Sequence, residues 1–281
     1  MMPRVTVVCV CFQHSRFIRE ALQSVADQTY PEVELIVVDD GSTDGSAAII
    51  RAWAANHPGV KLVLKPENRG YCAAFNSGRR LGTGDFFIDL AGDDILLPNR
   101  IAKGIAAFTE TGKPGIQFTD ACYISASGTI LSTHSDRFPS GQVPQGNVFT
   151  EVVRRYFICS PTMMMSRAVL EHLQGYDETL QYEDFDLWVR AARVFPFYYL
   201  PDVLVKKRVL AGSLSAQQFR GEAEHNRTTY RVCEKALALA ETLTEKNAVR
   251  YRVLYEARQR ARSFQWAWVA RYALLWLRTW T

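Results

Sequence analysis

The stretch Phe86–Asp94, FFIDLAGDD, decides how the fold is interpreted. Its first residues are mostly apolar and predict a buried strand, which runs directly into the adjacent carboxylates Asp93 and Asp94. Two carboxylates at the end of a buried strand are costly unless a cation lies beside them. Because ligands bind at the carboxyl ends of strands in open α/β sheets, we expect Mg²⁺ or Mn²⁺ here, carrying a phosphorylated ligand. The alternative is a capped turn in which Asp94 or Asn99 begins a helix.

The composition narrows the class of protein. The chain has 281 residues, of which 48% are hydrophobic, and its net charge is +4. This length suits one large domain or a domain with an appendage, and the charge gives no sign of nucleic-acid binding. The six cysteines form no CxxC pair, which argues against a zinc site and suits a reducing compartment. Since neither a signal-peptide layout nor an apolar run of about 18 residues occurs, we expect a cytoplasmic protein.

Strands and helices alternate through the first hundred residues. The apolar runs are rich in β-branched residues and nearly continuous, which is typical of parallel strands covered on both faces. Short connections between alternating elements predict βαβ units, and hence an α/β fold with a doubly wound sheet. The expected strands are Val5–Phe12, Glu34–Val38, Lys61–Lys65 and Phe86–Leu90. The expected helices are Arg16–Ala26, a helix that begins at Asp44 or Ser42 and ends at Ala55, and Tyr71–Leu81.

The second half of the chain is less regular. A polar stretch, Ser132–Gly146, is predicted to be a mobile loop near a site. The polar segment Gly212–Gln218 indicates a domain boundary, which divides the chain into residues 1–215 and a helical extension over 216–281. The other expected elements are a helix opened by residues 95–98 and continuing to 111, strands at 116–119, 123–125, 161–165, 197–200 and 203–208, and helices at 147–156, 166–173 and 183–194.

The final stretch, Ala257–Thr281, has five arginines, no acidic residue and four of the six tryptophans. Four aromatic side chains, those of Phe264, Trp268, Tyr272 and Trp276, fall on one helical stripe. A basic and aromatic amphipathic helix can lie in a membrane interface, so peripheral contact with the inner face of the membrane is one interpretation. The other is a helix packed on its own catalytic domain or on a second copy of the chain.

Polar residues follow each of the four expected parallel strands, at the edge where ligands bind. A nucleobase needs an acceptor for its ring N–H and an apolar face beside it, which Asp40 and Phe12 would provide. A diphosphate needs a cation, which a metal at the Asp93 and Asp94 pair would provide. There is no GxGxxG after the first strand and no GxxxxGK[ST], so this is neither a dinucleotide fingerprint nor a P-loop. The four groups are Cys11-Phe12-Gln13, Asp39-Asp40, Asn68-Arg69-Gly70 and Asp93-Asp94.

At these residues the sequence resembles the family 2 glycosyltransferases of the GT-A fold. The resemblance covers about residues 3–215, and its motifs occur together and in order, which is far more specific than any one of them. It implies a Rossmann-like, mostly parallel sheet flanked by helices, followed by the helical C-terminal extension. The matching segments are VTVVCVCFQ, Gln28-Thr29-Tyr30 before ELIVVDDGSTD, Asn68-Arg69-Gly70, Asn76, Gly84-Asp85, AGDDILLP, Gly175-Tyr176-Asp177-Glu178 and Tyr182–Trp188.

The resemblance implies a donor site for a nucleotide-diphospho-sugar. Asp40 would contact the base of the nucleotide, with Asp39 beside it. Phe12 would stack on the base, although it lacks the hydroxyl of the tyrosine that the family often has there. Arg69 would help to position the base or the diphosphate.

The resemblance also implies which carboxylates carry the chemistry. Asp93 and Asp94 would be the DxD-like motif, with Asp94 as the direct ligand of Mn²⁺ or Mg²⁺. Asp184, in the pair with Glu183, would be the catalytic base. Inverting transfer is a single displacement in which the acceptor hydroxyl loses its proton while a nucleoside diphosphate leaves, so a base and a cation are both needed. The alternative for the Glu183 and Asp184 pair is a carboxylate that only complements the helix dipole.

One departure from the family concerns the metal. The segment Lys207–Ser215 resembles one that often carries a histidine near the metal or the diphosphate, and Leu210 stands in that place. Leucine cannot ligate a metal. Either the metal has fewer protein ligands here, or Arg208, Ser213 or Ser215 neutralises the diphosphate instead.

The sequence therefore predicts an inverting glycosyltransferase that moves a sugar from a nucleotide-diphospho-sugar to an acceptor hydroxyl. By family analogy, the acceptor would be a saccharide or lipid-linked glycan in surface polysaccharide assembly. One alternative is a nucleotidyltransferase that makes a nucleotide sugar, but the first strand lacks the Gly-rich phosphate loop that this activity would need. The other alternative is an inactive binding subunit that acts through its C-terminal helices.

Overall fold

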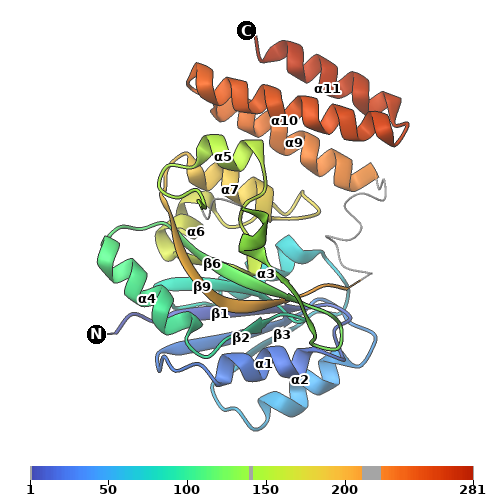
Figure 1. Cartoon of the computed structure of the whole chain (residues 1–281). Coiled ribbons are helices and arrows are strands. Elements are labelled where there is room, and N and C mark those ends of the chain that lie inside the picture. Colours follow the sequence, from blue (N-terminus) through green and yellow to red (C-terminus); the bar gives the residue numbers. More distant parts are fainter. Residues whose placement is uncertain (1, 139–141, 211–222, 281) are drawn as a thin grey trace.

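The computed structural model describes residues 2–138, 142–210 and 223–280 (Figure 1). These residues form a nine-stranded sheet in the order β3-β2-β1-β4-β8-β6-β9-β5, with β7 paired to β6. The strands are β1 (Val5–Cys11), β2 (Val33–Asp39), β3 (Lys61–Leu64), β4 (Phe86–Ala91), β5 (Ile95–Leu96), β6 (Ile116–Ile124), β7 (Ile130–Thr133), β8 (Met164–Ser166) and β9 (Phe197–Arg208).

Helices cover both faces of this sheet (Figure 1). The helices are α1 (Ile18–Ala26), α2 (Ser46–Ala54), α3 (Tyr71–Arg79), α4 (Arg100–Thr111), α5 (Phe149–Arg154), α6 (Arg167–Leu173), α7 (Asp184–Ala192), α9 (Ala223–Leu239), α10 (Leu243–Arg262) and α11 (Trp266–Arg278), with short 3-10 turns η1 (His134–Arg137) and η2 (Ser160–Thr162).

The strand directions bring several strand ends to one edge of the sheet. β1 pairs in parallel with β2 and β4, and β2 pairs in parallel with β3. β8 is antiparallel to both β4 and β6, and β9 is parallel to β6. It follows that β6 and β9 run in the same direction as β1 and β4, so that their carboxyl ends lie at the same edge. The predicted α/β fold is confirmed, with a second half that is mixed rather than parallel.

The alternation of side chains along β1 builds two cores, one on each face of the sheet. Val8 and Val10 pack with Phe75 of α3 and with the core that continues into α7. Val7 and Cys9 point the other way, into a core formed with α1, α2 and α4. All seven residues of β1 are buried, as expected for a strand covered on both faces.

Three expected elements differ from the observed ones. Ile95 and Leu96 do not open a helix but form β5, because they pair with β9, and α4 begins only at Arg100. The two short strands expected before and after residue 120 are one strand, β6, whose register against β9 shifts around Asp120. The strands expected at 197–200 and 203–208 are likewise continuous as β9. Local breaks in the apolar pattern therefore mark irregularities in long strands, not their ends.

The polar stretch expected to be a loop is partly ordered. Residues 130–133 form β7, which a turn joins to β6, and η1 follows directly. His134 is buried, and its ring nitrogens form hydrogen bonds with the Tyr123 hydroxyl at 2.7 Å and the Phe157 carbonyl at 2.8 Å. Its role is structural. Residues 139–141 of this stretch lie outside the described residues.

The C-terminal helices α9, α10 and α11 stack on one another at the end of the molecule that carries α5 and α7 (Figure 1). Their buried side chains belong to the same core as α7, so the extension shares its core with the sheet domain. The boundary expected between residues 215 and 216 lies outside the described residues. None of the described helices combines the length and the apolarity needed to cross a membrane.

The aromatic stripe of the last helix mostly faces the protein. Tyr272 is fully buried, and its ring lies 5.3 Å from that of Tyr230 on α9. Trp268 and Trp276 are half-buried against the same core. Phe264, by contrast, is 80% exposed before the helix begins. The aromatic stripe therefore packs against its own chain.

Candidate active site

A cavity of about 800 Å³ opens where the predicted motifs meet. The segment after β1 contributes Phe12 and His14, and the end of β9 contributes Lys207. Five carboxylates also line it, from β4, the turn after β4 and the start of α7: those of Asp89, Asp93, Asp94, Glu183 and Asp184. The edge of the sheet thus gathers negative charge from segments ninety residues apart in the sequence.

The turn after β4 presents Asp93 and Asp94 to the cavity. Asp94 is 3% exposed, and its Oδ1 accepts a hydrogen bond of 2.8 Å from the backbone N–H of Arg208. The Arg208 guanidinium donates to the backbone carbonyl of Asp93 at 3.0 Å and pairs with Glu20 at 2.6 Å. Burial, and then the charge of Asp93, raise the pKa of Asp94 to about 8. The pair is therefore held rigidly in a place that favours a cation.

The described residues can hold a divalent metal only with help from other ligands. They contain no group of three or more histidine, cysteine, aspartate or glutamate side chains arranged to ligate one. Leu210 lines the cavity and supplies no ligand. Mg²⁺ is commonly bound by one or two carboxylates together with substrate phosphates, so Asp93 and Asp94 fit such an ion. Ser213 and Ser215 lie outside the described residues.

Another part of the cavity lining is formed by the start of α7. Both Glu183 and Asp184 line the cavity, and Asp184 Oδ1 accepts a hydrogen bond of 2.6 Å from the Phe185 backbone N–H. Burial raises the pKa of Asp184, and burial together with the Asp184 charge raises that of Glu183. A carboxylate with a raised pKa is a better proton acceptor, as a general base requires.

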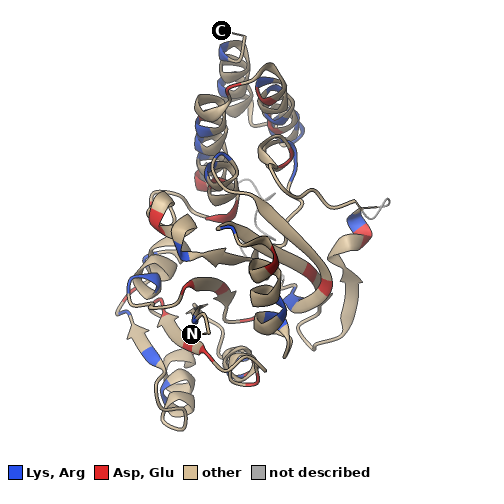
Figure 2. Ribbon diagram, turned by 90° about the vertical axis from the view of Figure 1, so that its left-hand side faces the viewer, with Lys and Arg blue, Asp and Glu red and all other residues tan. Residues whose placement is uncertain are grey.

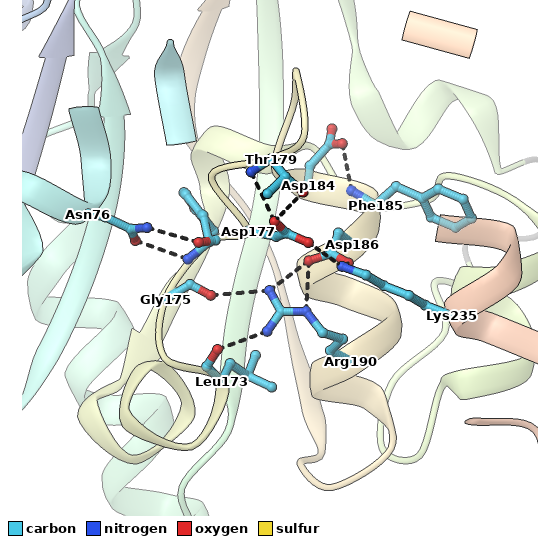
Figure 3. A network of polar contacts seen from close by, with 11 residues as sticks. Asn76, Leu173, Gly175, Asp177, Thr179, Asp184, Phe185, Asp186, Arg190 and Lys235 are labelled. Carbon is cyan, nitrogen blue, oxygen red and sulfur yellow. Dashed lines mark hydrogen bonds and ion pairs between the residues drawn. The ribbon is translucent and has the colours of Figure 1, made fainter. Parts of the chain in front are cut away.

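A separate polar cluster fixes α7 in place (Figure 3). Asp186, 1% exposed, pairs with Arg190 and with Lys235 of α9, each at 2.6 Å. Arg190 also donates to two backbone carbonyls in the turn at 173–175, and Lys235 pairs with Asp177. Asp184, the first residue of the same helix, takes no part in these contacts. Asp186 is therefore structural, and its neighbour Asp184 faces the ligand cavity.

The residues expected to bind the base lie beside the cavity. Phe12 is 40% exposed and lines it. Asp40 Oδ2 accepts from the backbone N–H groups of Arg69 and Gly70, at 3.1 and 2.9 Å, and Lys65 lies 3.1 Å from its Oδ1. The Asp40 carboxylate thus fastens the loop after β3. The Arg69 side chain is exposed and pairs with Glu67 instead.

Asp39 differs from its neighbour. Its Oδ2 accepts from the Ser42 backbone N–H at 3.1 Å, whereas its buried Oδ1 has no hydrogen-bond donor among the described residues. Among those residues, the cavity lining includes Phe12 but not Asp39, Asp40 or Arg69. The structure therefore brings Phe12, the metal pair and the catalytic pair together, and leaves the other three at its margin.

The sequence prediction missed two charged lining residues that lie in strands, Asp89 and Lys207. Asp89 accepts hydrogen bonds from the hydroxyls of Tyr71 and Tyr176, at 2.8 and 2.7 Å, and burial raises its pKa to about 7 against their lowering effect. A single acid in an otherwise apolar strand was the available signal. The second missed residue is Lys207, near the end of β9. Burial lowers its pKa, but the charges of Cys159, Asp94 and other groups outweigh burial and raise it. Its position beside the carboxylates depends on the pairing of β6 with β9, which no local pattern specified.

Comparison with known proteins identifies the family of this chain. A family model described as glycosyl transferase family 2 matches residues 6–173, more than half of the chain. The chain belongs to this family. It is a glycosyltransferase, and its predicted family is confirmed. Over 239 residues it is 27% identical to the putative glycosyltransferase EpsE of Bacillus subtilis, a match that covers 83% of each chain.

Two solved structures share the fold. The structure of residues 1–349 of S. aureus TarS in complex with UDP-GlcNAc superposes with a TM-score of 0.73 and 17% identity, over 98% of this chain and 79% of that one. The mannosyltransferase PcManGT of Pyrobaculum calidifontis, in complex with GDP-Man and Mn²⁺, gives a TM-score of 0.67 and 21% identity, over 100% of this chain and 84% of that one. The predicted GT-A fold is confirmed.

Proposed function

We propose that the protein transfers a sugar, with inversion, from a nucleotide-diphospho-sugar to a hydroxyl of a glycan acceptor. One observation carries this proposal: the carboxylate pairs Asp93 with Asp94 and Glu183 with Asp184 line a single cavity. One pair suits a cation that neutralises a leaving diphosphate, and the other suits a base for an attacking hydroxyl. Family membership and the ligands of the two structural relatives support the donor class.

The base side works as follows. The acceptor hydroxyl oxygen forms the new bond to the anomeric carbon while the bond from that carbon to the diphosphate breaks. Asp184 takes the hydroxyl proton, and the bonding electrons leave with the nucleoside diphosphate. The Phe185 N–H fixes the orientation of the Asp184 carboxylate through Oδ1, so that the other oxygen can accept the proton. Burial raises the pKa of Asp184 and so favours proton uptake.

The donor side uses the loops after β1, β2 and β4. Phe12 stacks on the nucleobase, and Asp39 Oδ1, which lacks a donor among the described residues, accepts a base N–H. Asp40 and the backbone at Arg69 shape this edge of the site through their mutual hydrogen bonds. Asp93 and Asp94 would hold Mn²⁺ or Mg²⁺, whose positive charge stabilises the departing diphosphate. Lys207 adds a second positive charge to the cavity, in the segment where this chain has Leu210 in place of the family's histidine.

A thermal-shift panel tests this function. UDP, GDP, CDP and dTDP, each with Mn²⁺, Mg²⁺ or EDTA, are added to the wild type, to Asp94→Asn and to Asp184→Asn. A ligand that binds only the folded state raises the melting temperature. We expect one nucleotide to give a metal-dependent shift that Asp94→Asn loses and Asp184→Asn keeps. No shift with any nucleotide would instead favour an inactive subunit.

The outer face of α11 supports a second, peripheral part of this proposal. Besides the buried stripe, Trp266, Leu274, Leu277 and Trp280 are each about 60% exposed, and Arg271 lies near them. We propose that this face contacts the surface of an anionic membrane, where aromatic and basic side chains are favoured. Co-sedimentation with phosphatidylglycerol vesicles should fall when Leu274→Glu and Leu277→Glu are combined. Equal sedimentation of both proteins would reject the membrane contact.

A further inference from the structure

A second cavity, of about 420 Å³, lies between α5, α9 and α10. Its lining is strongly basic: among the described residues, five arginines face a single carboxylate, Glu256. The arginines are Arg137, Arg154, Arg155, Arg252 and Arg260. Figure 2 shows several Lys and Arg positions, coloured blue, along the ribbon of the C-terminal helices.

The two innermost arginines carry more positive charge than the protein neutralises. Arg252 and Arg260 are 3% and 5% exposed, and they share Glu256, whose oxygens lie 2.9 and 3.6 Å from their guanidinium groups. The Nε atoms of both arginines are buried and have no hydrogen-bond partner among the described residues. Buried guanidinium groups are costly unless anions and acceptors satisfy them. The remaining charge and donors are therefore suited to an anionic ligand.

The rim of the cavity adds exposed arginines. Arg154 lies over the ring of Tyr251 and Arg155 over that of Phe138, at 5.1 and 5.5 Å. Arg137 donates to the backbone carbonyl of Tyr156 at 3.2 Å. Stacking on aromatic rings leaves the edges of a guanidinium open for bidentate hydrogen bonds, which match a phosphate group.

This second cavity adjoins the active site. Arg137, Tyr156 and His225 line both cavities. Arg252 donates to the Tyr156 hydroxyl, and its guanidinium lies 4.3 Å from the ring centre of Phe185, the residue after Asp184. The basic cavity is thus on the side of Asp184, where the proposed function has the acceptor bind, rather than at the donor loops.

We propose that this cavity is an acceptor subsite for a phosphate ester, so that the acceptor glycan carries a phosphate group near the hydroxyl to be glycosylated. This rests on the proposed function, because it takes Asp184 as the base. The phosphate could belong to a sugar phosphomonoester or to a phosphodiester chain, and both offer the same oxygens to the arginines. A carboxylate-bearing sugar is the competing ligand, since arginine also pairs with carboxylates.

The test is a calorimetric titration of the full chain in EDTA at constant ionic strength. The probes are inorganic phosphate, glucose 1-phosphate, bis(glycerol) phosphate and glucuronate. The variant combines Arg154→Gln with Arg155→Gln, which are exposed rim positions, so the fold is retained. The control combines Arg258→Gln with Arg262→Gln, two exposed arginines of α10 outside the cavity. The charge change is therefore the same in both proteins.

We expect saturable phosphate binding that weakens at least about tenfold in the rim variant and stays unchanged in the control. The two ester probes then show which source of phosphate is preferred. Binding that never saturates, or equal losses in variant and control, would overturn the proposal. Tighter binding of glucuronate than of any phosphate probe would also overturn the proposal, and would indicate a subsite for a carboxylate-bearing sugar.

Nucleotide binding keeps this proposal separate from the donor site. In the thermal-shift panel, both double variants should give the wild-type nucleotide shift. If the wild type binds phosphate saturably but no nucleotide, the donor proposal fails and the anionic subsite stands. If nucleotides bind and the rim variant matches the control with phosphate, the subsite fails and the donor proposal stands.

Discussion

Two aspartates of α7, two residues apart, should fail in opposite ways when they are changed to asparagine. Asp184 lines the cavity and makes one backbone contact, through Oδ1, that an asparagine carbonyl can also make. Asp186 is buried and takes part in ion pairs with Arg190 and Lys235. Asp184→Asn should therefore remove activity and keep stability, whereas Asp186→Asn should do the reverse.

The magnitudes follow from these contacts. Loss of a general base lowers kcat by about 10²–10⁴-fold, and loss of one charge at a helix start costs only about 0.3–1 kcal/mol. Removing one partner of a buried ion pair costs about 3–5 kcal/mol. For Asp186 the lower value applies, because Lys235 keeps Asp177 and Arg190 keeps two backbone carbonyls. At about 2–4 °C per kcal/mol, Asp186→Asn should melt about 6–12 °C lower.

The assay measures the release of nucleoside diphosphate at a temperature where both variants are folded. The donor is a sugar derivative of the nucleotide that stabilises the wild type in the thermal-shift panel. Melting is followed by circular dichroism on the same samples. A kcat for Asp184→Asn within threefold of the wild type would remove Asp184 as the base. If Asp186→Asn lost activity as completely as Asp184→Asn while melting normally, the assignment of the two roles would be reversed.

Three further changes test other parts of the structure. Burial would raise the pKa of Glu34, but hydrogen bonds from a lysine, a threonine and a backbone amide lower it to about 2. The Glu34 carboxylate therefore stabilises the fold above the ordinary glutamate pKa of about 4.3, and this stabilisation is lost as the pH falls toward 2. In urea unfolding, Glu34→Gln should therefore destabilise the protein more at pH 7 than at pH 3. Gly41→Ala should cost more than about 1–3 kcal/mol and weaken nucleotide binding, because φ is +77° and a Cβ would lie 2.5 Å from the Glu67 backbone. Gly59→Ala, with φ +96° and nothing within 4 Å, is the control for backbone strain alone. Lys207→Met should weaken nucleotide diphosphate binding about tenfold or more in thermal-shift titrations, and unchanged binding would separate Lys207 from the diphosphate.

The sequence was sufficient for the parts of the site that depend on local order. Each buried parallel strand was an apolar run, and the residues directly after it reach the sheet edge whatever the rest of the chain does. Asp93 and Asp94 could therefore be assigned from their place after β4. Glu183 and Asp184 were found at the start of a helix, by their resemblance to a family segment. Their approach to the metal pair follows from the fold.

The remainder depended on contacts between distant segments. Lys207 reaches the cavity because β9 pairs in parallel with β6, and the continuity of β9 was hidden by its irregular register. The basic cavity joins α5 to α10, about a hundred residues apart in the chain. In the sequence, Arg252 and Arg260 look like ordinary charges of a solvated helix. The packing of α10 on α5 and α9 buries them, so periodicity could not identify them.

The two adjacent acids after β2 do not share one task, and strand geometry gives the reason. Successive side chains of a strand point to opposite faces, so two neighbouring carboxylates at a strand end meet different surroundings. After β2, Asp40 fastens the next loop and has Lys65 beside its other oxygen, whereas Asp39 Oδ1 has no hydrogen-bond donor among the described residues. A sequence motif of two acids therefore locates a site without saying which acid meets the ligand. The same reasoning predicts that Asp40→Asn acts mainly through loop stability and Asp39→Asn mainly through the affinity for the base.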